Sequence, residues 1–447
     1  MVPRKRLSPG RLSRRAFLGR TLAASGSLAA APYVLAGRLA GAEAPSRRIT
    51  VGCIGLGRQT VYSNLPWFLT QPDVQVVAVS DVDAWRLDLG RNKVEAAYGK
   101  KAPSGRYGGC MATKDFREVL ARNDIDAIMI ATPDHWHAPM ALAAARAGKD
   151  VSLEKPITRT IEEGRLLSDT MRRFGRVFRT DTEIRSSQKA VRACELVLNG
   201  YIGRVHTIHV GVPKTEEACD PQPVMPVPEE LDYDLWLGPA PWAPYTEKRV
   251  HPRHDIKGRP GWMRVGDYCE GIVVNWGTHL ISLAQWGNGT ERTGPVAVEG
   301  RGTFPKEGLW NVLLDFRLEY RYADGVRLTY KMDRPYTRFV GSEGWIETGF
   351  DLLQADPPSL LKVRPKAGDH RLTLKHEKRD FIDAVKTRGP TVEDAEVGHR
   401  TTSLCQIGHI AIQLGRPLRW DPDKEEFPGD EEANRLRSRA LREPWRL

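Results

Sequence analysis

Two glycines at the end of a short apolar run could hold a phosphate group. The run RITVGCI leads into the hexapeptide GLGRQT, which follows the pattern G-x-G-x-x-T. In this pattern Gly55 would permit a tight turn, and Gly57 would let the backbone approach a pyrophosphate at the N-terminus of the next helix. Thr60 occupies the third glycine position, which mainly serves helix packing. The pattern therefore predicts a dinucleotide site whose loop also includes Arg58 and Gln59.

An acidic residue follows the glycine pair at the distance expected of a ribose ligand. Asp81 comes directly after the apolar run 74–80 and lies 24 residues beyond Gly57, close to the separation of about 20 residues that is typical of such a ligand. Its carboxylate could accept hydrogen bonds from the adenosine ribose hydroxyls and would repel a 2′-phosphate, which favours NAD over NADP. Arg58 and Arg86 are near enough in the sequence to weaken that preference, so NADP stays open. Asp81 could instead cap a helix or stabilise a turn.

Strands and helices must alternate along residues 48–180 to position these side chains. Short β-branched and apolar runs predict strands, and longer amphipathic segments predict helices. The expected strands are 48–55, 74–80, 125–131, 150–153 and 177–180. The expected helices are one that follows the glycines and ends at about Thr70, and two over 139–147 and 161–174. This alternation is typical of an α/β fold with a doubly wound parallel sheet of the Rossmann type.

Ligands of such sheets bind at the carboxyl ends of the strands, and polar residues gather at those ends here. Two of the ends carry the loop TPDHWH and the tripeptide EKP. The cofactor site is therefore expected to include Thr132, Pro133, His137, Glu154 and Lys155. His135 and His137 could share a metal in principle, but the sequence places no third ligand near them. Packing or cofactor contact is favoured for His137, and no metal site is predicted.

The composition is that of a globular protein, and its charge is unevenly distributed. The 447 residues suit two domains with additions, and 40% of them are hydrophobic. Much of the net charge of +11 lies in residues 1–44, and the remainder has no basic block interleaved with aromatic residues, which argues against a nucleic-acid partner. Beyond the N-terminus no apolar run is long enough to cross a membrane. The six cysteines form no CxxC pair, and Cys53 and Cys194 are expected to be buried free thiols.

Residues 1–44 have the parts of an export signal. A basic head precedes the apolar stretch 21–36, and small residues follow it. The pair Arg14-Arg15, followed by Phe17-Leu18, resembles the twin-arginine type of signal, which carries folded proteins with their cofactors already bound. An exported, periplasmic protein without stable membrane insertion is therefore predicted. An amphipathic arm or a membrane anchor is the alternative.

A longer segment resembles a known family. The run ATPDHWHAPMALAAARAGKDVSLEKPIT, with its E-K-P motif, is similar to the Gfo/Idh/MocA oxidoreductases, and the resemblance extends from about residue 48 to the end. Later stretches such as LDYDLWLGPAPWAPY and RFVGSEGWIETG resemble a branch with N-terminal export signals. The resemblance implies a nucleotide-binding domain over 48–180. It also implies a C-terminal α/β domain over 181–447 with an open, mostly antiparallel sheet.

The resemblance also implies catalytic roles. Lys155 would face the nicotinamide and the substrate and move a hydroxyl proton, a role that suits a lysine closed in beside a cationic ring. The family pattern D-x-x-x-H-x-x-D is here Asn275, His279 and Ser282, so the histidine is kept and both acids are replaced. Asn275 and His279 share one face of an expected helix over 272–286. Asn275 would orient the substrate, and His279 would help to move its proton.

The second domain is expected to combine a sheet with a long loop region. Strands are predicted over 203–212, 310–320, 326–332, 338–340 and 344–347. The segment 213–271, rich in proline, tryptophan and charge, is interpreted as a loop over one face or a subunit contact. Arg185 is placed by the resemblance near the nicotinamide or the pocket rim. Five tryptophans could stack on sugar rings, although such residues more often belong to a core or an interface: Trp236, Trp242, Trp262, Trp276 and Trp286.

These features predict an exported NAD(P)-dependent oxidoreductase that acts on the CH–OH group of a sugar, cyclitol or related polyol. A compartment without a nicotinamide pool would require a tightly held cofactor that is recycled in place. One alternative is a redox-assisted glycosidase or lyase, and another is a sugar-binding protein that has lost catalysis. The family resemblance implies a homodimer or homotetramer formed through the open sheet.

Overall fold

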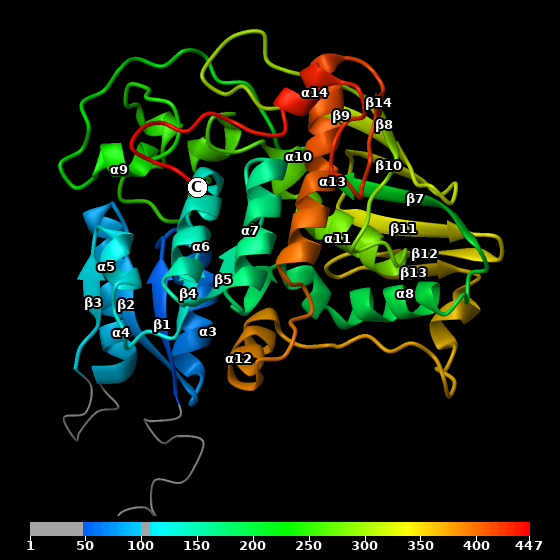
Figure 1. Ribbon diagram of the computed structural model, residues 1–447, viewed down its shortest axis with the longest axis horizontal. Coiled ribbons are helices and arrows are strands. Elements are labelled where there is room, and N and C mark those ends of the chain that lie inside the picture. Colours follow the sequence, from blue (N-terminus) through cyan, green and yellow to red (C-terminus); the bar gives the residue numbers. More distant parts are fainter. Residues whose placement is uncertain (1–47, 100–107) are drawn as a thin grey trace, which may run out of the picture. The chain divides into compact units, whose positions relative to one another are not determined.

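The computed structural model describes residues 48–99 and 108–447 (Figure 1). The predicted export signal at residues 1–44 lies outside these ranges. Within them, no helix combines the length and the hydropathy needed to cross a membrane. All six cysteines are buried and free, as expected for Cys53 and Cys194.

The first sheet has six strands, all parallel, in the order β3-β2-β1-β4-β5-β6. This doubly wound order confirms the predicted nucleotide-binding fold. Its strands are β1 (Ile49–Ile54), β2 (Val74–Ser80), β3 (Met111–Thr113), β4 (Ala127–Ile130), β5 (Asp150–Glu154) and β6 (Phe178–Asp181). The central strands are buried on both faces, because a parallel sheet is covered by helices on each side.

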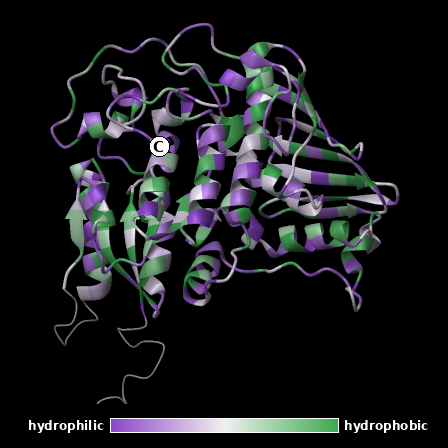
Figure 2. Ribbon diagram, in the orientation of Figure 1, coloured by the Kyte–Doolittle hydropathy of each residue, from purple (hydrophilic) through white to green (hydrophobic). Residues whose placement is uncertain are grey.

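Two hydrophobic clusters cover the faces of this sheet. The helices around it are α3 (Leu65–Thr70), α4 (Ala84–Gly99), α5 (Phe116–Leu120), α6 (His137–Arg146) and α7 (Ile161–Arg173). The hydroxyl of Thr160 caps α7 by accepting a hydrogen bond from Glu163 N at 3.3 Å. In Figure 2 the ribbon of α7 carries both hydrophilic and hydrophobic residues, and its buried Leu167 and Met171 belong to the core.

A helix from far along the chain completes the first domain. Phe381 and Ile382 of α12 (Glu377–Thr387) are buried in the same cluster as Val51 and Met129 of the sheet. Figure 1 places α12 beside the first sheet, although nearly 200 residues separate it from β6. The nucleotide-binding unit therefore includes a segment that no pattern within residues 48–180 indicated.

The second sheet has eight strands in the order β13-β12-β11-β7-β10-β9-β8-β14. Only the pair β7 and β10 is parallel among its paired strands, which confirms the expected mostly antiparallel sheet. The strands are β7 (Val205–Val212), β8 (Ala297–Thr303), β9 (Asp315–Arg321), β10 (Arg327–Met332), β11 (Tyr336–Gly341), β12 (Gly344–Thr348), β13 (Leu353–Asp356) and β14 (Leu418–Arg419).

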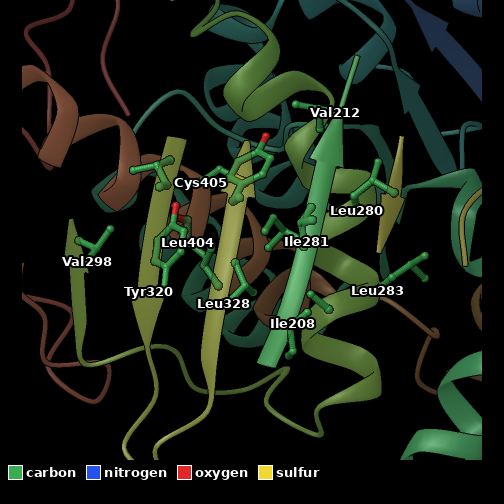
Figure 3. Close-up of a cluster of buried hydrophobic side chains, with 14 of the residues drawn as sticks. Ile208, Val212, Leu280, Ile281, Leu283, Val298, Tyr320, Leu328, Leu404 and Cys405 are labelled. Carbon is green, nitrogen blue, oxygen red and sulfur yellow. The ribbon is translucent and has the colours of Figure 1, made fainter. Parts of the chain in front are cut away.

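One face of the second sheet is covered by α8 (Gln188–Leu198), α11 (Gly277–Gly287) and α13 (Ala395–Leu414). Figure 3 shows Ile208 of β7 and Leu328 of β10 in one apolar cluster with Ile281 of α11. The residues of β9 alternate between exposed and buried, as expected for a strand with one covered face. The expected helix over 272–286 is divided at Trp276 into α10 (Ile272–Asn275) and α11.

The chain end returns to the first domain after α14 (Glu431–Arg435). The ring of Trp445 packs edge-on against Trp136 with 4.6 Å between centroids. Arg439 Nε donates to Glu163 Oε1 of α7 at 2.8 Å. These contacts tie the last residues to the helices that follow β4 and β5.

Candidate active site

A cavity of about 680 Å³ opens at the carboxyl ends of the first sheet, between that sheet and the second domain. Its position is the one expected of a ligand site in a doubly wound sheet. The structure brings together here all but one of the predicted site residues: Gly55, Gly57, Arg58, Gln59, Asp81, Thr132, Pro133, His137, Glu154, Lys155, Asn275 and His279.

The glycine turn has the geometry that a pyrophosphate requires. Gly55 has φ +85, and a Cβ there would lie 2.6 Å from the backbone oxygen of Ala131, so only glycine fits. At Gly57, by contrast, no described atom lies within 4 Å of where a Cβ would be. Thr60 is buried, and its hydroxyl donates to Gly55 O at 2.6 Å. Thr60, which occupies the third glycine position, thus stabilises the turn.

The helix after the turn is locally widened. Residues Thr60–Asn64 form a short π-helical turn, η2, which continues into α3. Lys93 Nζ donates to Val61 O at 2.7 Å, and Asn64 Nδ2 donates to Glu154 Oε1 at 3.2 Å. Widened turns of this kind are frequent at functional sites. This one links the glycine loop to the end of β5.

Asp81 holds the glycine turn from the end of β2. Its carboxylate accepts hydrogen bonds from Leu56 N at 2.7 Å and from Asp83 N at 2.9 Å. Burial raises the pKa of Asp81, although the charge of Arg86 and these two hydrogen bonds act to lower it. Each carboxylate oxygen can accept further hydrogen bonds, and the side chain lines the cavity. Asp81 can therefore hold the glycine turn and accept hydrogen bonds from a ribose at the same time.

The residues present fit a bound dinucleotide. The open space beside Gly57 admits a pyrophosphate, and Arg58 is an exposed cation on the same wall. Asp81 offers acceptors to a ribose, while Thr132 and Pro133 line the cavity at the end of β4.

Lys155 and Asn275 meet in the lining of the cavity. Lys155 follows β5, and its Nζ donates to Asn275 Oδ1 at 3.2 Å and to Asn275 O at 3.3 Å. Asn275 comes from α10 of the second domain, so this contact joins the two domains at the site. An amide in this place orients the amine without neutralising its charge.

His279 lies beside the same pair in an apolar setting. Its ring packs edge-on against Trp276 and Phe350, with centroids 6.1 and 5.2 Å away. Burial, and then the charge of Lys155, hold the pKa of His279 well below its usual value. Its Nδ1 is buried with no hydrogen-bond partner among the described residues. A neutral imidazole with a free ring nitrogen can bind a substrate hydroxyl.

The expectation for Arg185 was wrong. Arg185 does not line the cavity, and its buried guanidinium donates to Ser282 Oγ at 2.7 Å and pairs with Glu291 and Glu393. Burial opposes its charge, but the two carboxylates outweigh this effect and raise its pKa. Ser282 in turn donates to Glu393 Oε1 at 3.0 Å. Of the two positions where the family pattern has an acid, only position 275 therefore faces the cavity.

His137 ties two loops together. Its Nδ1 lies 2.6 Å from Pro156 O, and its Nε2 lies 2.9 Å from Thr132 O. Burial lowers the pKa of His137 to about 4, so the two carbonyl contacts cannot both be donated bonds at neutral pH. Among the described residues no group of three or more His, Cys, Asp or Glu could hold a metal ion.

Several cavity residues were not anticipated from the sequence. Asp134 is 2% exposed and lines the cavity, and burial raises its pKa to about 7. It lies in the loop TPDHWH, where its place at a strand end was a usable signal. Phe350 and the segment around His251 also line the cavity. Of the five tryptophans, Trp236, Trp262 and Trp276 line it, Trp242 is exposed and Trp286 is buried under Arg185.

Known proteins resemble parts of this chain. A "Glycosyl hydrolase family 109 protein" of Saccharopolyspora erythraea is 36% identical over 157 residues, 35% of this chain and 33% of that protein. Levoglucosan dehydrogenase of Pseudarthrobacter phenanthrenivorans is 36% identical over 100 residues, 22% of this chain and 26% of that protein. The chain thus spans about a third or less of the length of these relatives.

Solved structures share the fold over most of the chain. An aldose-aldose oxidoreductase from Caulobacter crescentus, solved with glycerol, has a TM-score of 0.59 at 16% identity and covers 83% of this chain and 100% of its own. Levoglucosan dehydrogenase in complex with NADH and L-sorbose has a TM-score of 0.57 at 19% identity, with 83% and 99% covered.

Two family models match nearly all of the described chain. The NAD-binding Rossmann-fold model of the oxidoreductase family matches residues 49–182, and the C-terminal alpha/beta model of the same family matches residues 216–447. Together with the glycine turn and the doubly wound sheet, these matches identify the first domain as an NAD-binding domain. The chain belongs to the Gfo/Idh/MocA oxidoreductase family and carries its NAD-binding domain.

Proposed function

We propose that this protein oxidises the CH–OH group of a sugar, cyclitol or related polyol. The observation that carries the proposal is the contact between Lys155 Nζ and Asn275, in the same cavity as the glycine turn. NADP stays open as a second cofactor, because Arg58 and Arg86 line the cavity near Asp81.

Lys155, Asn275 and His279 each have a distinct task. NAD, when bound, supplies the acceptor of a hydride from the substrate carbon. Lys155 takes the proton of the substrate hydroxyl, and Asn275 orients both the lysine and the substrate. His279, neutral and unpartnered at Nδ1, binds a neighbouring hydroxyl or passes the proton on. The product is a carbonyl compound.

The location of the protein and the fate of its cofactor belong to the same proposal. The Arg14-Arg15 pair supports export in the folded state to the periplasm. A compartment without a nicotinamide pool requires NAD to stay bound, so one substrate would be oxidised and a second reduced in turn. Lys155 would return its proton to the second substrate, which closes the cycle without an outside oxidant. A homodimer or homotetramer through the open sheet is part of this proposal.

A second candidate is a redox-assisted glycosidase or lyase, which the names of several related glycosyl hydrolase family 109 proteins favour. Transient oxidation of a ring carbon would acidify the neighbouring C–H, and elimination would break the glycosidic bond. Return of the hydride would restore the carbon, so this reaction also needs no net oxidant. Lys155, Asn275 and His279 suit either reaction. A sugar-binding protein without catalysis is the remaining alternative, and the meeting of these three side chains speaks against it.

The first experiment is to purify the mature protein and identify the nucleotide released on denaturation. The holoprotein is then mixed with a panel of sugars and polyols while nicotinamide absorbance is followed. Reduction by a polyol, reversed by a second carbonyl sugar, is expected. Release of sugar from aryl glycosides without added NAD would favour the glycosidase instead. Repeated recovery of a protein that neither contains nor binds NAD(P) would overturn both.

A further inference from the structure

Residues 228–264, called the strap here, lie across the cavity. The strap contains α9 (Tyr233–Leu237) and the short helices η5 (Glu247–Arg249) and η6 (Gly261–Arg264). Figure 1 shows α9 and its flanking loops above the strand ends of the first sheet. The strap residues that line the cavity are Trp236, His251, Ile256, Gly258, Arg259, Pro260, Trp262 and Met263.

The strap is a preformed element with its own core. Its buried Tyr233, Trp236 and Val250 pack in one cluster with Tyr268. At Gly261 a Cβ would collide with the backbone oxygen of Lys248, so the chain is tightly folded on itself there. Such packing makes the strap a stable wall of the cavity rather than a loose loop.

One side of the strap is anchored beside the expected ribose position. His251 Nε2 lies 2.9 Å from Asp83 Oδ2, and Arg86 Nη2 donates to Asp255 O at 3.1 Å. Burial opposes the charge of Asp83, but the hydrogen bond and charge of His251 and the charge of Arg86 outweigh it and leave its pKa lowered. Asp83 N in turn donates to Asp81 Oδ1, so the anchor joins the turn that carries the predicted ribose acceptor.

The backbone reinforces this first anchor. Ala84 N and Lys114 Nζ both donate to Glu230 O, at 2.9 and 3.0 Å. Asp232 N donates to Val82 O at 3.0 Å. The strap is therefore joined to the ends of both β2 and β3.

The other side of the strap is anchored at the end of β4. Trp136 Nε1 donates to Trp236 O at 3.1 Å, and His135 Nε2 lies 3.1 Å from the same oxygen. Gly238 packs so closely on the ring of Trp136 that a Cβ would collide with it. The two anchors stand at the two strand ends that flank β1, whose end carries the glycine turn.

We propose that the strap completes the NAD site and keeps the adenosine half of the cofactor bound between catalytic cycles. With both anchors closed, the strap covers the cofactor from the side opposite the sheet, and the cofactor leaves only after an anchor opens. The inference rests on the proposed function, because only a reaction that recycles its NAD in place benefits from such retention.

The test measures cofactor release from the holoprotein rather than activity. The protein is loaded with NADH and diluted into excess NAD, and the loss of bound NADH fluorescence gives the release rate. Release from His251→Ala is expected to be at least tenfold faster, because a hydrogen bond to a buried carboxylate is lost. His251→Gln, which keeps a donor, should release NADH more slowly than His251→Ala. His206→Ala removes an exposed histidine outside the cavity and should release NADH at the unmodified rate.

A second measurement does not depend on any substitution. Amide hydrogen exchange over residues 247–264 should slow on NADH binding in the unmodified protein. Exchange unaffected by NADH, or release from folded His251→Ala as slow as from the unmodified protein, would overturn the inference. Asn275→Ala separates the two proposals, because it should slow substrate oxidation and keep slow NADH release.

Discussion

Lys155 Nζ lies 3.2 Å from Asn275 Oδ1 and 3.3 Å from Asn275 O, at the point where the two domains meet. The pattern of the family has an aspartate at position 275, so this lysine has a neutral partner where a carboxylate is expected. Ser282, at the second position where the family pattern has an acid, forms hydrogen bonds with Arg185 and Glu393 outside the cavity. The departure from the pattern is therefore one change at the site, and its effect is electrostatic.

Replacement of Lys155 by alanine should remove the proposed proton acceptor. Positioned acid–base groups contribute about 10²–10⁴-fold to rate, so substrate-dependent NAD reduction should fall by about 100-fold or more. Stopped-flow absorbance on the holoprotein measures this step. Lys189→Ala is the matched control, since that lysine is exposed on α8 and donates to Asp351 O outside the cavity. If Lys155→Ala reduced NAD at the full rate, another group would have to accept the proton of the substrate hydroxyl.

Asn275→Asp restores the acid of the family pattern. A carboxylate 3.2 Å from Lys155 Nζ would stabilise the ammonium form, which cannot accept a proton. Oxidation should then require a higher pH than in the unmodified protein, and a rate profile from pH 5 to 10 measures the shift. Asn275→Ala removes the side-chain acceptor without adding charge and should slow the reaction at every pH. Superimposable profiles for Asn275→Asp and the unmodified protein would contradict the electrostatic account.

The two glycines of the turn should respond differently to alanine. Gly55→Ala places a methyl group 2.6 Å from Ala131 O at φ +85, so it should lower the midpoint of unfolding as well as NAD binding. Gly57→Ala places its methyl group in open space and should leave the midpoint unchanged. NAD binding should nevertheless weaken about tenfold or more, because the methyl group occupies the approach of the pyrophosphate. Calorimetry of both variants measures these effects. Unchanged NAD affinity in Gly57→Ala would show that the pyrophosphate does not bind at this position.

The stability of the protein should depend on pH through Asp134. Burial raises the pKa of Asp134 to about 7 from an ordinary value of 3.8. Between these values the folded state keeps a proton that the unfolded chain has lost, so the free energy of unfolding falls as pH rises through this window. Asp134→Asn removes the titration and should flatten the dependence by a few kcal/mol. Urea unfolding at pH 4.5 and 7.5 measures the difference.

Glu396 provides a control of opposite sign. Burial opposes its charge, but hydrogen bonds from Arg165, Arg400 and Ser168 outweigh it and lower its pKa. Its contribution is present above the ordinary carboxyl range and lost as pH falls. Glu396→Gln should therefore destabilise the protein at pH 7.5 and have less effect at low pH. A pH dependence of stability in Asp134→Asn and in Glu396→Gln identical to that of the unmodified protein would show that neither carboxyl group titrates as argued.

The first sheet was predictable because its strands are short buried runs with turn residues at their ends. The predicted strand 74–80 coincides with β2, and the other four predicted strands differ from the observed ones by at most two residues at each end. The edge strand β3, which is only three residues long, was not predicted. The glycine turn and Lys155 were predictable for the same reason, since every parallel strand ends at one edge. Local patterns are enough for such a site.

Contacts between distant segments were not predictable. The Asp83–His251 pair joins residues 168 positions apart, and neither residue has a neighbour in sequence that indicates the other. Arg185 was misplaced because its partners Glu291 and Glu393 lie far along the chain. The expected helix is interrupted at Trp276, next to Gly277, whose close contacts with Tyr330 and Cys405 likewise come from distant segments.

The packing of α12 on the first sheet has a consequence for synthesis. On a ribosome the strands of the NAD-binding domain emerge first, yet the apolar surface that Phe381 and Ile382 cover stays open until residue 387 has left the exit tunnel. A truncated product that stops between the two domains would expose this surface and aggregate or be degraded. Only a chain translated past residue 387 can close its first domain, so the fold itself discriminates such products from those interrupted earlier.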